Sequence, residues 1–119
     1  MTTPEGKVKA AVKKVLAARN IVPAGSKREM QKEDPDAKGW YYMPVKGTSF
    51  GVNGIHDFVG CANGLFFSIE TKAGKGVMSA HQEYRAQGIR RGRGAMFLVT
   101  AVDDTAALDL WLSEVTADM

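Results

Sequence analysis

The sequence of 119 residues has a single cysteine, Cys61, and no long apolar segment. One cysteine excludes an internal disulfide and a metal cluster built on cysteine alone, so we expect Cys61 to pack as a small apolar residue. No apolar run approaches the roughly 18 residues that a transmembrane helix requires, and the first residues lack the hydrophobic stretch of a secretion signal. We therefore expect a cytoplasmic protein that has no membrane partner.

Basic residues are absent from the last nineteen positions, which hold five acids. The net charge of +3 therefore hides an asymmetry, because residues 1–100 carry 16 bases and only 8 acids. A surplus of eight positive charges suits a polyanion such as nucleic acid. The length and the 45% hydrophobic content are typical of one globular domain that can bury a core.

Residues 54–72 predict two short strands joined by a tight turn at residues 62–64. The turn contains an Asn-Gly pair, which tolerates positive φ angles. Side chains alternate in a strand, so Glu70 and Lys72 point to the same face about 7 Å apart. An antiparallel hairpin returns Asp57, at the start of the first strand, to the far end of the second. Two carboxylates and one ammonium are therefore expected to lie together.

Two neighbouring carboxylates can hold a hard divalent cation such as Mg²⁺. A lysine beside them can orient or deprotonate an attacking water, or stabilise developing charge, as phosphodiester hydrolysis requires. The alternative is that Glu70 and Lys72 form the solvated face of an edge strand and that Asp57 is a turn residue. These three residues alone leave both interpretations open.

The first helix is predicted to begin at Thr3 and Pro4, with threonine as the cap. Apolar residues then recur at helical spacing for about four turns. Glu5 shares a stripe with the apolar positions 8, 12 and 16, so its carboxylate is expected to face inward. An acid in the first turn also interacts favourably with the helix dipole, and both explanations of Glu5 stand at this point.

Residues 20–38 are polar and lack periodicity, which predicts a loop with at most one helical turn, either a solvated connector or an arm that contacts DNA or a partner subunit. The aromatic segment 40–43 predicts a strand. Lys75 lies in a Gly-flanked loop that lacks the ending of a P-loop, and it is either a phosphate contact or a solvent-facing residue. Ser79 and Gln82 fit a capping box that opens a second helix.

This second helix is expected to end in the densest basic cluster of the chain, Arg90, Arg91 and Arg93, a pattern that commonly contacts the phosphate backbone. Residues 95–100 form an apolar strand suited to a sheet covered on both faces. A last helix is expected after a cap at Asp103 or Asp104. Its predicted buried stripe consists of Ala107, Leu108, Trp111, Leu112 and Val115. The order of elements predicts an α/β three-layer domain on a small mixed sheet.

The order Asp57, Glu70-Thr71-Lys72, a Gly-rich loop and Ser79-Ala80-His81-Gln82 resembles the VRR-NUC branch of the PD-(D/E)XK nuclease superfamily, in its small, stand-alone, phage-type form. The resemblance extends from Glu5 to the strand near Val99. One departure is His56, because the family usually has proline before the aspartate.

The resemblance implies a three-layer PD-(D/E)XK nuclease-like fold (order αβββαβα) that spans residues 1–119 as one domain. It also implies a DNA endonuclease that depends on Mg²⁺ or Mn²⁺. The implied metal residues are Glu5, Asp57 and Glu70, and the implied catalytic residues are Asp57, Glu70, Lys72 and Gln82. Lys75 and the three arginines would then bind DNA.

Small members of the family that stand alone look like junction resolvases, which implies a branched DNA substrate such as a Holliday junction, a homodimer, and the host cytoplasm for a phage-encoded chain. Trp40, Tyr41, Tyr42 and the helix with Trp111 offer large apolar surface, part of which could lie at a subunit interface. Two alternatives are a non-catalytic basic nucleic-acid-binding module and a flap or nicking nuclease without junction preference.

Overall fold

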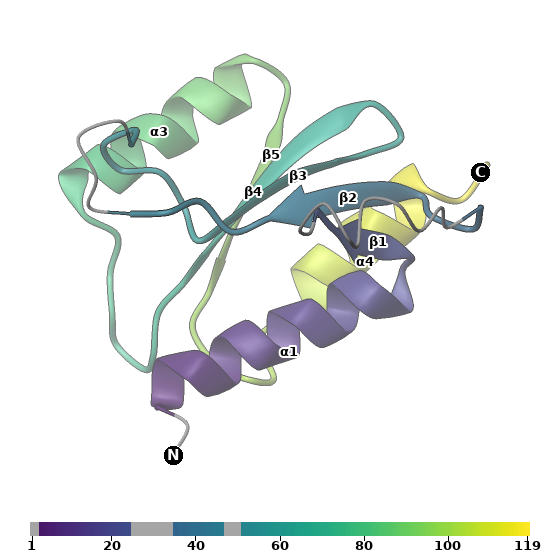
Figure 1. Cartoon of the computed structure of the whole chain (residues 1–119). Coiled ribbons are helices and arrows are strands. Elements are labelled where there is room, and N and C mark those ends of the chain that lie inside the picture. Colours follow the sequence, from purple (N-terminus) through teal and green to yellow (C-terminus); the bar gives the residue numbers. More distant parts are fainter. Residues whose placement is uncertain (1–2, 25–34, 47–50) are drawn as a thin grey trace.

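The computed structural model describes residues 3–24, 35–46 and 51–119 (Figure 1). These residues form three helices and a sheet of five strands. Among them, no helix is both long and apolar enough to cross a membrane. The elements in chain order are α1 (Pro4–Ala18), β1 (Ile21–Pro23), β2 (Gly39–Tyr42), β3 (Phe58–Ala62), β4 (Leu65–Thr71), α3 (Ala80–Arg91), β5 (Ala95–Val99) and α4 (Ala106–Val115).

The sheet is mixed, and its strands follow the order β1-β2-β3-β4-β5. The central strand β3 is antiparallel to both β2 and β4, whereas β1 and β5 each run parallel to their neighbours. Helices α1 and α4 lie together on one face, and α3 lies on the other (Figure 1). The predicted α/β class with helices on both faces of a small mixed sheet is therefore confirmed.

The hydrophobic core lies between the sheet and the pair α1 and α4. Alternate residues of β3 and β4, such as Phe58, Phe67 and Ile69, are fully buried there. Each such side chain contributes roughly 1.5–3 kcal/mol by leaving water. Arg19 at the end of α1 donates two hydrogen bonds to Asp109 of α4, at 2.8 and 3.1 Å, which ties the two helices together.

Several local predictions are confirmed. The hairpin turns at Asn63 and Gly64, whose φ angles are 49° and 79°. Helix α1 begins after Thr3, whose side chain accepts a hydrogen bond from the backbone N–H of Gly6. Helix α3 begins with the predicted capping box, in which Ser79 and Gln82 each bond the backbone of the other. These signals are short-range, so the sequence alone specifies them.

One prediction for the first half of the chain needs correction and lies partly outside the described residues. The predicted loop 20–38 contains the short strand β1, which pairs with β2 and buries Ile21. Three residues are too few to show a period-two pattern, and the strand exists because β2 lies beside it. Residues 25–34 of the predicted loop lie outside the described residues.

The end of the chain also differs from the prediction. Helix α4 begins after Thr105 rather than at an aspartate cap, because the Asp104 carboxylate accepts hydrogen bonds from Thr100 instead. Ala107 is exposed. Strand β5 is an edge strand of the described sheet and leaves Leu98 exposed, so it is not covered on both faces throughout.

The aromatic residues are divided between the two faces of the sheet. Tyr41 is buried in the core, whereas its neighbours Trp40 and Tyr42 point to the opposite face and are 46% and 44% exposed. Trp111 packs against Phe67 and Phe97, at ring-centre distances of 5.9 and 5.7 Å. Of these four residues, only Trp40 and Tyr42 are exposed enough to lie at a subunit interface. Tyr41 and Trp111 pack in or against the core.

Gly54 lies in the loop before β3, where its φ angle is +74° and α3 passes close by. A Cβ atom here would overlap the backbone carbonyl of His81 in the first turn of α3. Gly64 has a similar φ angle of +79°, but a Cβ atom there would meet no other atom within 4 Å. A comparison of substitutions at the two glycines therefore separates the cost of backbone strain from the cost of an atomic overlap.

We predict that Gly54→Ala lowers the free energy of unfolding more than Gly64→Ala. Each substitution costs about 1 kcal/mol by placing alanine in a left-handed conformation. Only Gly54→Ala adds an overlap, which costs roughly 1–3 kcal/mol more. Urea denaturation of the two variants measures the difference. Equal losses would show that α3 does not depend on this close approach.

Candidate active site

Asp57 and Glu70 lie side by side at one end of the central hairpin. Phe58 pairs with Ile69 across β3 and β4, so Asp57 and Glu70 occupy the next position along the same register. The backbone N–H of Asp57 donates a hydrogen bond to Glu70 Oε1 at 3.1 Å. The two side chains are only 7% and 1% exposed. The juxtaposition expected from the hairpin is therefore confirmed. Glu70 lies on an interior strand of the sheet and is buried, so it does not belong to the solvated face of an edge strand.

One oxygen of each carboxylate is held by the scaffold. Asp57 Oδ2 accepts hydrogen bonds from the backbone N–H of Thr71 at 2.9 Å and from its hydroxyl at 2.6 Å. Glu70 Oε2 accepts one from Gln82 Nε2 at 2.6 Å and lies 3.2 Å from Lys72 Nζ. The structure thus brings together four residues that the sequence singled out, and adds Thr71.

The remaining two oxygens converge on a lysine that sequence reasoning missed. Lys46 Nζ lies 2.6 Å from Asp57 Oδ1 and 3.4 Å from Glu70 Oε1. Lys46 follows β2 and belongs to no strand or helix. It has no motif or periodic position, so only the folded structure places it here. Lys9 of α1 lies at 4.0 Å from Asp57 Oδ1.

Charge keeps the carboxylate of Asp57 ionised. Burial on its own would raise the pKa of Asp57, but hydrogen bonds from Lys46 and Thr71 outweigh it, and this pKa lies below its usual value. Burial would lower the pKa of Lys46, but its hydrogen bond to Asp57 and the charges of Asp57 and Glu70 raise this pKa above its usual value. Asp57 and Lys46 are therefore both charged at neutral pH.

His56 is fully buried and connects the sheet to α3. Its Nδ1 lies 2.7 Å from the hydroxyl of Ser68 on β4, and its Nε2 lies 2.9 Å from the backbone carbonyl of Gln82. The imidazole therefore fixes the first turn of α3 above β4, where the Gln82 amide reaches Glu70. The only sequence signal of this role was the presence of histidine where the resembling family usually has proline.

The other predicted site residues lie outside this cluster. Glu5 is half-buried in the first turn of α1, one turn before Lys9. Lys75 is exposed in the loop after β4. The three predicted DNA-binding arginines are exposed at the far end of α3, where Arg90 lies 3.8 Å from the sulfur of Met96. The rise of the helix over the nine residues from Gln82 to Arg91 is about 14 Å, so the arginines lie roughly that far along α3 from Gln82.

The two carboxylates fit a magnesium ion better than a metal that needs a complete protein cage. Within the described ranges, no three histidine, cysteine, aspartate or glutamate residues form a group that could hold a metal ion, so Glu5 is not assembled with Asp57 and Glu70. Mg²⁺ commonly keeps several waters and takes only one or two carboxylates together with substrate phosphates. Asp57 and Glu70 can supply the two carboxylates of such a ligand set.

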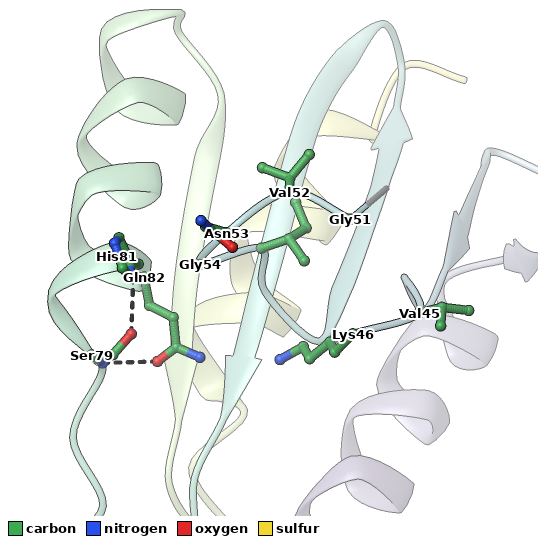
Figure 2. A pocket seen from close by; sticks show the side chains of 10 residues that line it. Val45, Lys46, Gly51, Val52, Asn53, Gly54, Ser79, His81 and Gln82 are labelled. Atoms are coloured by element: carbon green, nitrogen blue, oxygen red, sulfur yellow. Dashed lines mark hydrogen bonds between the residues drawn. The ribbon is translucent and has the colours of Figure 1, made fainter. Parts of the chain in front are cut away.

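A cavity of about 210 Å³ opens beside the cluster (Figure 2). The loop at residues 51–55 and the first turn of α3 form its walls. Figure 2 shows Lys46 and Gln82 pointing toward one another from opposite sides, with Ser79 and His81 beside Gln82. The cavity is thus lined by Lys46 and Gln82, the two side chains that also contact the carboxylates.

We predict that Thr71→Val lowers the free energy of unfolding by about 1.5–3 kcal/mol, because a buried, charged acceptor loses its hydroxyl donor while the side-chain shape is kept. The matched control is Thr100→Val, which removes a 3.2 Å bond to the exposed Asp104 and should cost less than about 1 kcal/mol. Urea denaturation measures both losses. A loss for Thr71→Val no larger than the control would contradict a costly buried carboxylate.

No family model matches this sequence, and neither the curated proteins nor the solved structures contain a match.

Proposed function

We propose that this protein is a metal-dependent DNA endonuclease of the VRR-NUC type, in which Asp57 and Glu70 bind Mg²⁺ or Mn²⁺. The observation that carries the proposal is the convergence of one oxygen from each buried carboxylate on a single cation position, with Lys72 and a cavity beside it. Such a metal would polarise a phosphodiester and lower the pKa of a bound water.

Lys72 is the residue that we propose to assist the attacking water. Its ammonium lies 3.2 Å from Glu70 Oε2, and its side chain is 25% exposed, so it is both anchored to the site and accessible to substrate. A positive charge at this place would stabilise the charge that develops on the phosphate. Gln82 donates to the same oxygen of Glu70, so we assign it the role of orienting that carboxylate.

Substrate binding is assigned to exposed basic residues outside the carboxylate cluster. Lys75 and the arginine cluster (Arg90, Arg91 and Arg93) are exposed, and contacts between such side chains and phosphates weaken as salt rises. Glu5 lies one helical turn before Lys9, and it is left out of the proposed metal ligands because it is not grouped with Asp57 and Glu70 among the described residues. The proposed place of action is the cytoplasm, that of the host if the chain is phage-encoded.

We predict that cleavage of DNA requires Mg²⁺ or Mn²⁺ and that Asp57→Asn and Glu70→Gln each reduce it at least about a hundredfold, because a small oxygen site loses one of two anionic ligands. The matched control is Glu83→Gln, an exposed acid on α3, which should cleave normally. Cleavage assays with circular dichroism as the fold check measure this. Full activity in chelator, or an active Glu70→Gln protein, would overturn the assignment.

The competing candidate is a basic nucleic-acid-binding module without catalysis. It is favoured by one observation, namely that three lysines lie within 4.0 Å of the carboxylates, as in a structural ion network. The Glu70→Gln experiment separates the two. A nuclease loses cleavage in this variant and keeps DNA binding, whereas a binding module shows no metal-dependent cleavage in any form.

We further propose that the protein acts as a homodimer on branched DNA such as a Holliday junction. A two-fold dimer offers two related active sites to a substrate of matching symmetry. The exposed aromatic residues support a contact surface: Trp40 is aligned with Cys61 and Phe66 across β2, β3 and β4, and Phe66 is 44% exposed. Tyr42 lies beside Trp40, with ring centres 6.4 Å apart.

We predict a dimer at micromolar concentration that dissociates in the double variant Trp40→Ser/Phe66→Ser, because these side chains would supply the apolar contact. Sedimentation velocity measures the mass. In parallel, a four-way junction should be cleaved faster than a linear duplex of equal length. A monomeric wild-type protein without junction preference would favour the alternative of a flap or nicking nuclease.

A further inference from the structure

Lys46 occupies the position where a bridging cation would be expected. Its ammonium is within 3.4 Å of both carboxylates, and the two oxygens that it contacts are those that Thr71, Lys72 and Gln82 leave available. The only other donor to this pair of oxygens within hydrogen-bond distance among the described residues is the backbone N–H of Asp57. Among the lysines near the carboxylates in the described residues, the Lys46 ammonium is therefore the one that bridges both members of the pair.

Lys46 differs from the neighbouring lysines in how it is held. Its side chain is 41% exposed and lines the cavity, and its backbone lies outside the strands that carry the carboxylates (Figure 2). It can therefore leave the carboxylates without disturbing the sheet. Lys72, by contrast, directly follows β4 and is bound to the oxygen that Gln82 also holds.

Electrostatics makes the ammonium and a divalent cation mutually exclusive at this position. Two nearly buried carboxylates at such close range need a compensating positive charge, because neither can be solvated well. A divalent cation at the same oxygens would stand within a few ångströms of the ammonium, where like charges repel strongly in a site of low dielectric. Binding of the one therefore requires release of the other.

We propose that Lys46 is a built-in counter-cation that a divalent metal must replace, and that it thereby sets the metal affinity of the site. The released side chain then lies in the cavity between the 51–55 loop and α3. This inference rests on the proposed metal-dependent function, but it concerns binding and not cleavage. Lys46 is a positioning residue in the metal-free protein, where it holds the two carboxylates at a fixed separation.

The test is a titration of Mn²⁺ by isothermal calorimetry into the wild-type protein and variants. Lys46→Met should bind Mn²⁺ at least about tenfold more tightly, since the ion no longer competes with a charge-assisted hydrogen bond. Lys46→Arg should restore weaker binding. Lys9→Met, which removes an equal charge 4.0 Å from Asp57 without bridging the pair, should change affinity much less.

Thermal unfolding gives a second readout. Without metal, Lys46→Met should melt below the wild type, because the carboxylates lose their counter-ion; Mn²⁺ should raise its melting temperature more than that of the wild type. If Lys46→Met does not fold without metal, Lys46→Gln, which keeps a hydrogen-bond donor without the charge, takes its place with the same expectation.

The outcomes separate this inference from the proposed function. One outcome is that the wild type binds Mn²⁺, Glu70→Gln does not, and Lys46→Met binds no more tightly than the wild type. In that case the proposed replacement of Lys46 by the metal is wrong, and the proposed metal site is retained. The exchange is also wrong if Lys9→Met tightens binding as much as Lys46→Met. If neither the wild type nor Lys46→Met binds Mn²⁺, both the exchange and the metal-dependent function are overturned.

Discussion

The burial of two adjacent carboxylates is the constraint on which the rest of this structure depends. Removing an ionised carboxylate from water costs several kcal/mol unless donors and cations replace the lost solvent. For Asp57 and Glu70 those groups come from separate parts of the chain: Thr71 from β4, Gln82 from α3, Lys46 from the segment after β2 and Lys72 from the end of the hairpin. The carboxylate pair therefore ties α3, which contributes no residue to the main hydrophobic core cluster, to the strands that do.

The core and the site lie on opposite faces of the same strands. Phe67 and Ile69 of β4 pack against α1 and α4, while Ser68 and Glu70 face α3. Because side chains alternate along a strand, a shift of one residue in the register of β3 and β4 would bury the carboxylates in the apolar core. The apolar packing of one face thus fixes the positions of the charged groups on the other.

The sheet also lies between the acidic end of the chain and the arginine cluster. Helix α4 and the acidic end of the chain lie on one face, and α3 with its arginine cluster lies on the other. The acids are therefore kept from the helix that carries the arginines. His56 holds α3 in place, because its ring nitrogens lie within hydrogen-bond distance of the Ser68 hydroxyl and the Gln82 backbone carbonyl.

The sequence by itself determined the elements whose signals are short-range: the Asn63-Gly64 turn, the Thr3 cap, the capping box of Ser79 and, through the hairpin, the meeting of Asp57 with Glu70 and Lys72. Each depends on residues that are neighbours in the chain or on one strand register. Only the tertiary structure decided that β1 is a strand, that Lys46 and His56 join the site, and that Glu5 is not assembled with the two carboxylates. These outcomes depend on contacts between segments without a shared period, and no local pattern encodes such contacts.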